Sequence, residues 1–173
     1  ALASGMFGRK VFHIGPARDD GFFAAVSDEE FYHGQDIERV AMEDAEGIVC
    51  TGLFDDETET PADYREIILY GQNKGLKMLC ANPDIFVDRG EKRIYCAGAI
   101  AQAYEEAGGD ARYFGKPHAP VYQLARRRLE AARGEPVADD RILCIGDGIN
   151  TDIAGGMGEG MDTLFITGGL LRQ

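Results

Sequence analysis

Short apolar runs alternate with amphipathic stretches along most of the chain. Runs of four or five mainly apolar residues, closed by glycine, proline or polar residues, predict strands at 11–14, 47–50, 76–80, 142–145 and 163–167. Apolar positions three and four residues apart predict helices over 61–74, 98–107 and 118–133, and a short helix over 152–158. Strand, helix and strand across 47–80 make a βαβ unit, whose strands are parallel. The pattern therefore predicts an α/β fold.

The ends of the helices have signals of their own. Thr60 suits the N-cap of the helix over 61–74, Pro61 its first turn and Gly75 its end. Two further short strands, 85–87 and 93–96, are expected around a turn at 89–91. For the helix over 118–133, the inward side chains are expected to be Val121, Leu124, Ala125, Leu129 and Ala132, and the three arginines 126–128 are expected on a solvated face.

Length and charge narrow the class of protein. At 173 residues the chain suits one domain or two small ones, with a hydrophobic content of 45% that is ordinary for a globular protein. The net charge is −12, and all of the excess acidity lies in residues 1–110. That distribution argues against nucleic-acid binding, which needs a basic face. No apolar run approaches the ~18 residues that a membrane span needs.

The cysteines indicate the cellular compartment, and the first residue bears on how the chain was processed. Cys50, Cys80, Cys96 and Cys144 contain no CxxC pair, so a zinc site is not expected. Each lies in or beside an apolar run, and we expect buried, reduced thiols in a cytoplasmic protein. The chain begins with Ala1 rather than Met and shows no export signal. We expect it to be processed or cut from something longer.

Two carboxylates follow the apolar run 142–145. Gly146 ends the run, and Asp147 and Asp152 come next. Open α/β sheets bind their ligands at the carboxyl ends of the strands, and paired carboxylates there suit Mg²⁺, which usually shares its oxygen ligands with a substrate phosphate. Asp152 is also well placed to cap the short helix, and that reading stays open. A dinucleotide-binding glycine turn does not fit, because Thr151 stands where the third glycine belongs.

Two other segments are candidates for ligand binding. Lys116 precedes Pro117, which holds it in an extended backbone from which its ammonium can reach an anion. Asn82-Pro83-Asp84 follows a predicted strand, where it is equally suited to bind a ligand or to form a turn. His13, in an apolar run, is expected to have a structural role.

The motifs at 115–118 and 146–152, about thirty residues apart, resemble those of the haloacid dehalogenase-like hydrolases. They read Gly-Lys-Pro-His and Gly-Asp-x-x-x-Thr-Asp. The segments 81–84 and 96–99 are similar to the class IIA branch of that family, which includes sugar-phosphate and nucleotide phosphatases. The resemblance implies a Rossmannoid core with an inserted α/β cap of the C2 type. It places the cap at residues 1–110 and the carboxyl-terminal part of the core at 111–173.

The resemblance also implies roles for single residues. Lys116 matches the lysine that neutralises the phosphate and the nucleophile, so it is expected to bind substrate and to act in catalysis. Asp147 matches a Mg²⁺ ligand, and Asp152 matches the second acid, which supports the metal shell or the lysine. Asn82 and Asp84 match a cap loop that faces the active site. The implied partner is a small phosphorylated metabolite, with a homodimer or association through the exposed half-core.

One part of the family pattern is missing. The nucleophile belongs to a DxDG string directly after a strand, and the nearest string, Asp19-Asp20-Gly21, has the wrong spacing. Thr51 superficially fits the second motif but falls in the region that matches the cap. We therefore expect the cap and second half-core of a Mg²⁺-dependent phosphatase, inactive by itself. The alternative is a non-catalytic module that binds a cation or a partner. A receiver-like signalling domain fits less well, because paired acids should follow the first strand.

Overall fold

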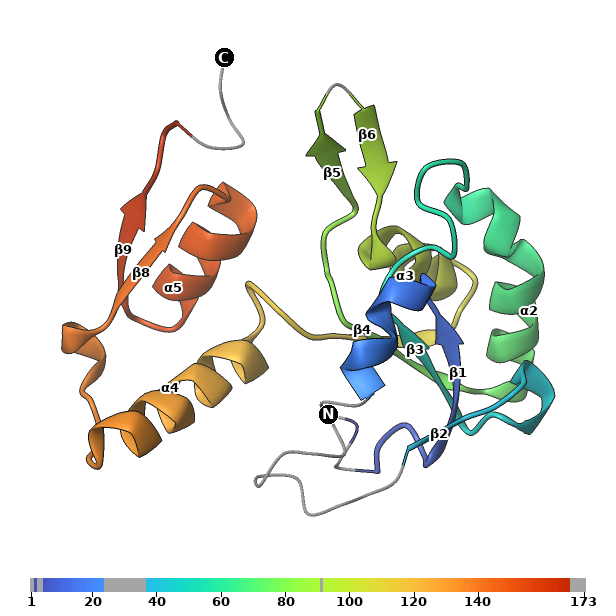
Figure 1. The fold of residues 1–173 in the computed structure, drawn as a ribbon, viewed down its shortest axis with the longest axis horizontal. Helices are drawn as coiled ribbons and strands as arrows, with labels where there is room; N and C mark the ends of the chain where they lie inside the picture. Colours follow the sequence, from blue (N-terminus) through green and yellow to red (C-terminus); the bar gives the residue numbers. More distant parts are fainter. Residues whose placement is uncertain (1, 3–4, 24–36, 91, 169–173) are drawn as a thin grey trace. The chain divides into compact units, whose positions relative to one another are not determined.

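The computed structural model describes residues 2, 5–23, 37–90 and 92–168. The chain divides into two compact units, Ala1–Tyr113 and Phe114–Gln173 (Figure 1). Parallel strands joined by helices occur in both units, so the predicted α/β class is confirmed.

A five-stranded parallel sheet forms the centre of the first unit. Its strand order is β2-β1-β3-β4-β7, and the four pairings are all parallel. The chain runs from β1 to β2 on one side and then returns to place β3 on the other side of β1, so the strand order reverses between β1 and β3. The strands are β1 Lys10–Ile14, β2 Glu38–Arg39, β3 Gly47–Cys50, β4 Lys77–Cys80 and β7 Asp110–Tyr113.

The hydrophobic core lies where helices α2 (Arg65–Lys74) and α3 (Ala97–Glu106) pack on this sheet. Every residue of β3 is buried, as expected of a parallel strand covered on both faces. A Cβ built on Gly71 of α2 would lie 2.8 Å from Cδ1 of Ile48 and 3.3 Å from Cε2 of Tyr104, so the helix approaches the strand closely. The hydroxyl of Tyr104 donates to the carbonyl of Leu76 at 2.6 Å, which satisfies both buried groups.

The start and end of the helical segment 61–74 agree with its predicted signals. Thr60 and Asp63 form a capping box, with Pro61 in the first turn. Gly75 ends the helix in the left-handed region at φ 69°, which glycine adopts without strain. The first turn, η4 (Pro61–Tyr64), is a 3₁₀ rather than an α-helical turn.

Some strands could not be placed from the sequence. A hairpin of β5 (Phe86–Arg89) and β6 (Lys92–Tyr95) forms between β4 and α3, as expected. β5 begins one residue and ends two residues later than expected, and β6 begins and ends one residue earlier. Glu91 of the predicted turn lies outside the described residues. Strands β2 and β7 were missed. β2 has two residues, and β7 is an edge strand whose Asp110 and Arg112 interrupt the apolar pattern.

The second unit contains one long helix and a two-stranded parallel sheet. Strands β8 and β9 pair in parallel, with Ile145 opposite Leu164. The segment after β8 is a π-helical turn, η6, which leads directly into α5. The elements are α4 Ala119–Arg133, η5 Asp139–Arg141, β8 Leu143–Gly146, η6 Ile149–Ile153, α5 Ala154–Gly158 and β9 Asp162–Phe165. Short 3₁₀ turns in the first unit are η2 Ala17–Asp20 and η3 Met42–Asp44.

Helix α4 differs from its prediction in two ways. Tyr122 is its buried residue, whereas Ala125 and Ala132, expected to face inward, are exposed. Arg126, expected on a solvated face, pairs with Asp139 at 2.8 Å and with Glu159 at 2.6 Å. The guanidinium therefore ties the helix to η5 and to the residue that follows α5.

The apolar run 142–145 is typical of a buried parallel strand, but among the described residues β8 is covered on one face only. A Cβ on Gly156 of α5 would lie 2.9 Å from Cβ of Cys144 and 2.6 Å from Cγ2 of Thr163, so α5 covers the face that carries these two side chains. Leu143, Ile145 and Leu164 are exposed. An apolar run alone does not reveal which partner, if any, covers the second face.

Two further expectations concerned the burial of the cysteines and the presence of membrane-spanning segments. Cys50, Cys80 and Cys96 are buried free thiols, and Cys144 is half-buried. Among the described residues, every helix is too short or too polar to cross a membrane.

Candidate functional site

The loop after β8 and the segment before α4 meet in the second unit. The Lys116 ammonium pairs with Oδ1 of Asp152. The other carboxylate oxygen of Asp152, Oδ2, accepts hydrogen bonds from the backbone N–H of Gly148 at 3.0 Å and of Asp147 at 3.2 Å. Asp152 thus joins the lysine to the turn that carries Asp147, and the structure brings three of the predicted site residues together.

Glycine at position 146 makes this arrangement possible. A Cβ built there would lie 2.1 Å from Cγ of Asp152 and 2.3 Å from its Oδ2, a distance that two such atoms do not tolerate. The carboxyl group can therefore lie against the end of β8 only because residue 146 has no side chain. The sequence signal Gly-Asp-Gly marks this close approach as well as a turn.

The surroundings of Asp152 favour its ionised form. Burial alone would raise the pKa of the carboxyl group, but the hydrogen bonds from Lys116 and from the Gly148 N–H, together with the lysine charge, lower this pKa below its ordinary value of 3.8. Asp152 is therefore a carboxylate at neutral pH. Both of its oxygens already have donors, so its main role in this arrangement is to position Lys116 and the 146–148 turn.

The donors at the end of β8 suit a hard cation in kind. Asp147 is half-buried and follows directly after the strand. Mg²⁺ in proteins is usually held by one or two carboxylates, with water and phosphate oxygens in the remaining positions. Within the described ranges, no three side chains among His, Cys, Asp and Glu group together to hold a metal. The carboxylate of Asp147 therefore fits a Mg²⁺ site that water and phosphate oxygens complete. It does not fit a site whose ligands all come from the protein.

Asn82 and Asp84 lie in the first unit, directly after β4. The Asp84 N–H donates to Oδ1 of Asn82 at 3.1 Å, which is the turn geometry that was one of the two readings of this segment. The Asp84 carbonyl accepts from the N–H of Gly98 at 3.1 Å and so fixes the turn to the start of α3. Neither of these two hydrogen bonds involves the side-chain carboxylate of Asp84.

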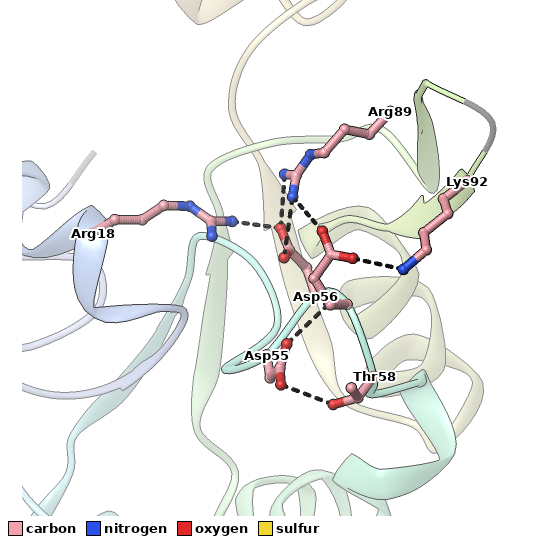
Figure 2. Close-up of polar contacts among 7 residues, drawn as sticks. Arg18, Asp55, Asp56, Thr58, Arg89 and Lys92 are labelled. Carbon is pink, nitrogen blue, oxygen red and sulfur yellow. Dashed lines mark hydrogen bonds and ion pairs between the residues drawn. The ribbon is translucent and has the colours of Figure 1, made fainter.

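Charged side chains also connect the loops at the carboxyl edge of the five-stranded sheet. We call Arg18, Asp56, Glu57, Arg89 and Lys92 the charged-loop network (Figure 2). Asp56 accepts from Arg18 at 2.5 Å and from Arg89 at 3.0 Å, while Glu57 accepts from Arg89 at 3.0 Å and from Lys92 at 3.2 Å. These residues come from the loops after β1 and β3 and from the β5–β6 hairpin.

Asp56 is the central residue of this network. Its side chain is 10% exposed, and burial alone would raise its pKa, but the hydrogen bonds from Arg18 and Arg89 lower the pKa below its ordinary value. Asp55 stays local, accepting from the Glu57 N–H at 3.0 Å and from the Thr58 hydroxyl at 2.9 Å. In the sequence, residues 55–59 are an acidic run between a predicted strand and a predicted helix, and the basic partners of this run are distant. Charged residues after successive parallel strands were the signal, since such strands end at the same edge.

Comparison with known proteins finds one family match and two phosphatases that are similar to part of the chain. Residues 113–173 match the HAD-hydrolase-like family. An acid sugar phosphatase of Staphylococcus haemolyticus is 26% identical over 98 residues, which are 56% of this chain and 35% of that protein. A dihydroxyacetone phosphatase of Corynebacterium glutamicum is 27% identical over 97 residues, which are 56% of this chain and 33% of that protein.

A solved structure covers nearly the whole chain. A haloacid dehalogenase-like hydrolase from Brucella suis is 46% identical and superimposes with a TM-score of 0.80, over 93% of this chain and 58% of that one. The chain thus spans little more than half of this relative and about a third of the two curated phosphatases.

Proposed function

Because the chain belongs to the haloacid dehalogenase-like hydrolase family, we propose that it carries part of the active site of a phosphatase for small phosphomonoesters. The supporting observation is the pairing of Lys116 with Asp152 beside Asp147, at the carboxyl end of β8. Phosphoryl transfer depends mainly on positioning and on neutralising charge. In this proposal, the ammonium group of Lys116 neutralises negative charge, and the carboxylate of Asp147 at the strand end holds the cation that positions the phosphate.

Each residue has a role in the proposal. Lys116 binds a phosphate oxygen, since an ammonium has three donors and the pairing with Asp152 uses only one direction of approach. Asp152 orients the lysine and the 146–148 turn. Asp147 holds Mg²⁺, which supplies positive charge toward the phosphate oxygens when bound. Asn82 and Asp84 remain proposed substrate contacts. The first unit corresponds to the proposed cap and the second to the proposed half-core.

Among the described residues, the proposed site has no assigned nucleophile. Asp19 and Asp20 lie in the 3₁₀ turn η2 rather than directly after a strand, because Gly15 and Pro16 separate them from β1. We therefore propose that residues 1–173 alone do not turn over a phosphomonoester. The buried free thiols support a reducing compartment such as the cytoplasm.

Binding of phosphate and metal tests the site without requiring turnover. Inorganic phosphate is titrated into the chain with and without Mg²⁺ while the amide resonances of Gly148 and Lys116 are followed. We expect both resonances to move, with tighter phosphate binding when Mg²⁺ is present. Lys116→Met should weaken phosphate binding, and Asp147→Asn should remove the effect of Mg²⁺. Asp162→Asn, which changes an exposed acid in the same unit, serves as the control.

Three outcomes would contradict the proposal. If neither phosphate nor Mg²⁺ moves the two amides, the site assignment is wrong. If Mg²⁺ binds but phosphate does not, the non-catalytic cation-binding module is the better description. Turnover of an aryl phosphate with Mg²⁺, lost in Asp147→Ala or Lys116→Ala, would refute the inactivity of the isolated chain and leave the family function intact.

A further inference from the structure

A shallow cavity of about 600 Å³, widely open to solvent, lies on the first unit beside the point where the strand order reverses. Its lining includes Gly15, Pro16 and Ala17, which follow β1, and Phe54, which follows β3. In doubly wound sheets with this strand order, ligands bind outside the carboxyl ends of the strands at the reversal. The cavity therefore lies where the topology of the first unit favours a ligand.

The walls of the cavity combine apolar side chains with polar and charged groups. Phe12 and Val40 line it with half-buried side chains that also pack against the hydrophobic core. Phe54 is held in place by stacking on Tyr64, with ring centroids 5.5 Å apart. A volume of several hundred Å³ that brings apolar side chains together with a small number of polar groups is typical of small-molecule sites.

The charged-loop network steadies two of these walls. Arg18 follows Ala17 in the loop after β1, and Asp56 lies two residues beyond Phe54 in the loop after β3. Their ion pair at 2.5 Å joins the two loops beside the cavity, and Arg89 adds a second bond to Asp56 (Figure 2). The cavity is thus bounded by loops that ion pairs hold together, which favours a preformed shape.

One acid and one base line the cavity, and they pair with each other. Arg39 contacts Asp20, and their side chains are 44% and 52% exposed. A guanidinium has five N–H donors and a carboxylate has about four acceptor positions, so each group can bind a further partner while the pair persists. The pair therefore offers a donor for a carboxylate and an acceptor for an ammonium side by side.

The remaining titratable group in the lining adds no charge. His13 bonds to the hydroxyl of Thr51 at 3.0 Å and lies edge-on to Phe23. Burial, helped by the charge of Arg39, lowers the pKa of His13 below its ordinary 6.5, although Asp20 and Asp19 act in the opposite direction. At neutral pH the lining is therefore balanced in charge, while residues 1–110 carry the whole of the excess acidity of the chain. A bare anion is disfavoured in that field.

We propose that this cavity binds a small zwitterion with an apolar group, the chemistry of an α-amino acid. The carboxylate of the ligand faces Arg39, its ammonium faces Asp20, and its apolar group lies against Phe12, Val40 and Phe54. The site goes beyond the proposed phosphatase function, because none of its residues is Lys116, Asp147 or Asp152. The two proposals can fail separately.

Three probes of one size test the charge requirement. L-phenylalanine carries both charges, 3-phenylpropanoate lacks the ammonium, and 2-phenylethylamine lacks the carboxylate. Each is titrated into the full chain while the His13 imidazole and Thr51 amide resonances are followed. We expect L-phenylalanine to shift both resonances and to bind at least tenfold more tightly than either of the others.

Substituting either member of the Arg39–Asp20 pair should remove one part of the preference for L-phenylalanine. Arg39→Gln should abolish the advantage of L-phenylalanine over 2-phenylethylamine, and Asp20→Asn its advantage over 3-phenylpropanoate. The matched control is the pair Arg93–Asp88 on the hairpin. Arg93 lies over the ring of Phe86, with Cζ 4.5 Å from the ring centroid, as Arg39 lies over the ring of Phe23 at 5.2 Å. Arg93→Gln and Asp88→Asn should leave binding unchanged. Failure of L-phenylalanine to shift the two resonances, or equal binding of all three probes, would overturn the proposal.

Discussion

The two carboxylate oxygens of Asp152 have different partners, and one substitution separates their effects. Lys116→Met keeps the aliphatic stem but removes the ammonium from Oδ1, while the backbone donors on Oδ2 stay. Because the lysine hydrogen bond and charge both lower the pKa of Asp152, this pKa should increase in the variant, while the backbone donors continue to lower it. The Gly148 amide shift, measured between pH 2 and 6, reports the titration directly. Lys92→Met, which removes a lysine from Glu57, should leave the Gly148 midpoint unchanged.

The same pKa has a consequence for stability. The folded-state pKa of Asp152 lies below its unfolded value, so its contribution is present above pH 3.8 and is lost as the pH falls through the lowered pKa. Since Lys116 is half exposed, Lys116→Met should cost about 1 kcal/mol of unfolding free energy at pH 7. That difference should shrink below pH 3.8. An equal difference at pH 7 and pH 2.5, measured by urea unfolding, would mean that the ion pair does not stabilise the second unit.

At the scale of elements, the contact of α3 with the Asn82–Asp84 turn depends on Gly98. A Cβ there would lie 2.2 Å from the Pro83 carbonyl oxygen and 2.5 Å from that of Asp84. Backbone atoms cannot give way as a flexible side chain does, so Gly98→Ala should displace the turn and cost about 1–3 kcal/mol, against a smaller gain in helix propensity. Gly21→Ala, where the added Cβ meets nothing within 4 Å, is the control and should be neutral or slightly stabilising. Thermal unfolding and the Asp84 amide shift measure both effects; an unmoved amide in Gly98→Ala would contradict the proposed contact.

Elements with a local signal were predictable from the sequence, and those defined by distant partners were not. The helix over 65–74 has a capping box before it and a glycine after it. β3 is a continuous apolar run, and β4 is apolar after Lys77. The edge strand β7 depends on its pairing with β4 more than on its own residues. Tyr122 was overlooked as the buried residue of α4, because helical periodicity does not show which face meets a partner.

In the candidate site, too, some contacts were predictable from the sequence and others were not. Lys116 and Asp152 were predicted to converge, and the structure pairs them. The use of both Asp152 oxygens could not be foreseen, because it requires the close approach that Gly146 permits. In the charged-loop network, the sequence shows the charged residues after the strands but not their pairing, because the partners come from three loops that the fold brings to one edge.

At the scale of the whole molecule, the face of β8 and β9 opposite α5 predicts self-association. Leu143, Ile145 and Leu164 are 52%, 61% and 48% exposed, and Ile145 lies opposite Leu164 in the pairing. Parallel sheets are normally covered on both faces, and exposed strands with apolar side chains favour association. The chain should therefore form dimers or larger species whose fraction increases with concentration. The double variant Ile145→Thr and Leu164→Thr introduces threonine, a β-branched residue that is compatible with strands. It should shift the population toward monomer.

The matched control is Leu69→Thr, which changes an exposed leucine on α2 in the first unit and should leave association unchanged. Light scattering after size exclusion, at several protein concentrations, measures the effect. A wild-type chain that stays monomeric throughout would mean that the apolar face tolerates water, and the argument from sheet burial would fail for this unit. Association reduced equally by Leu69→Thr would instead place the contact elsewhere. Loss of association only in the β8–β9 variant would identify this face as the surface through which the chain meets a partner.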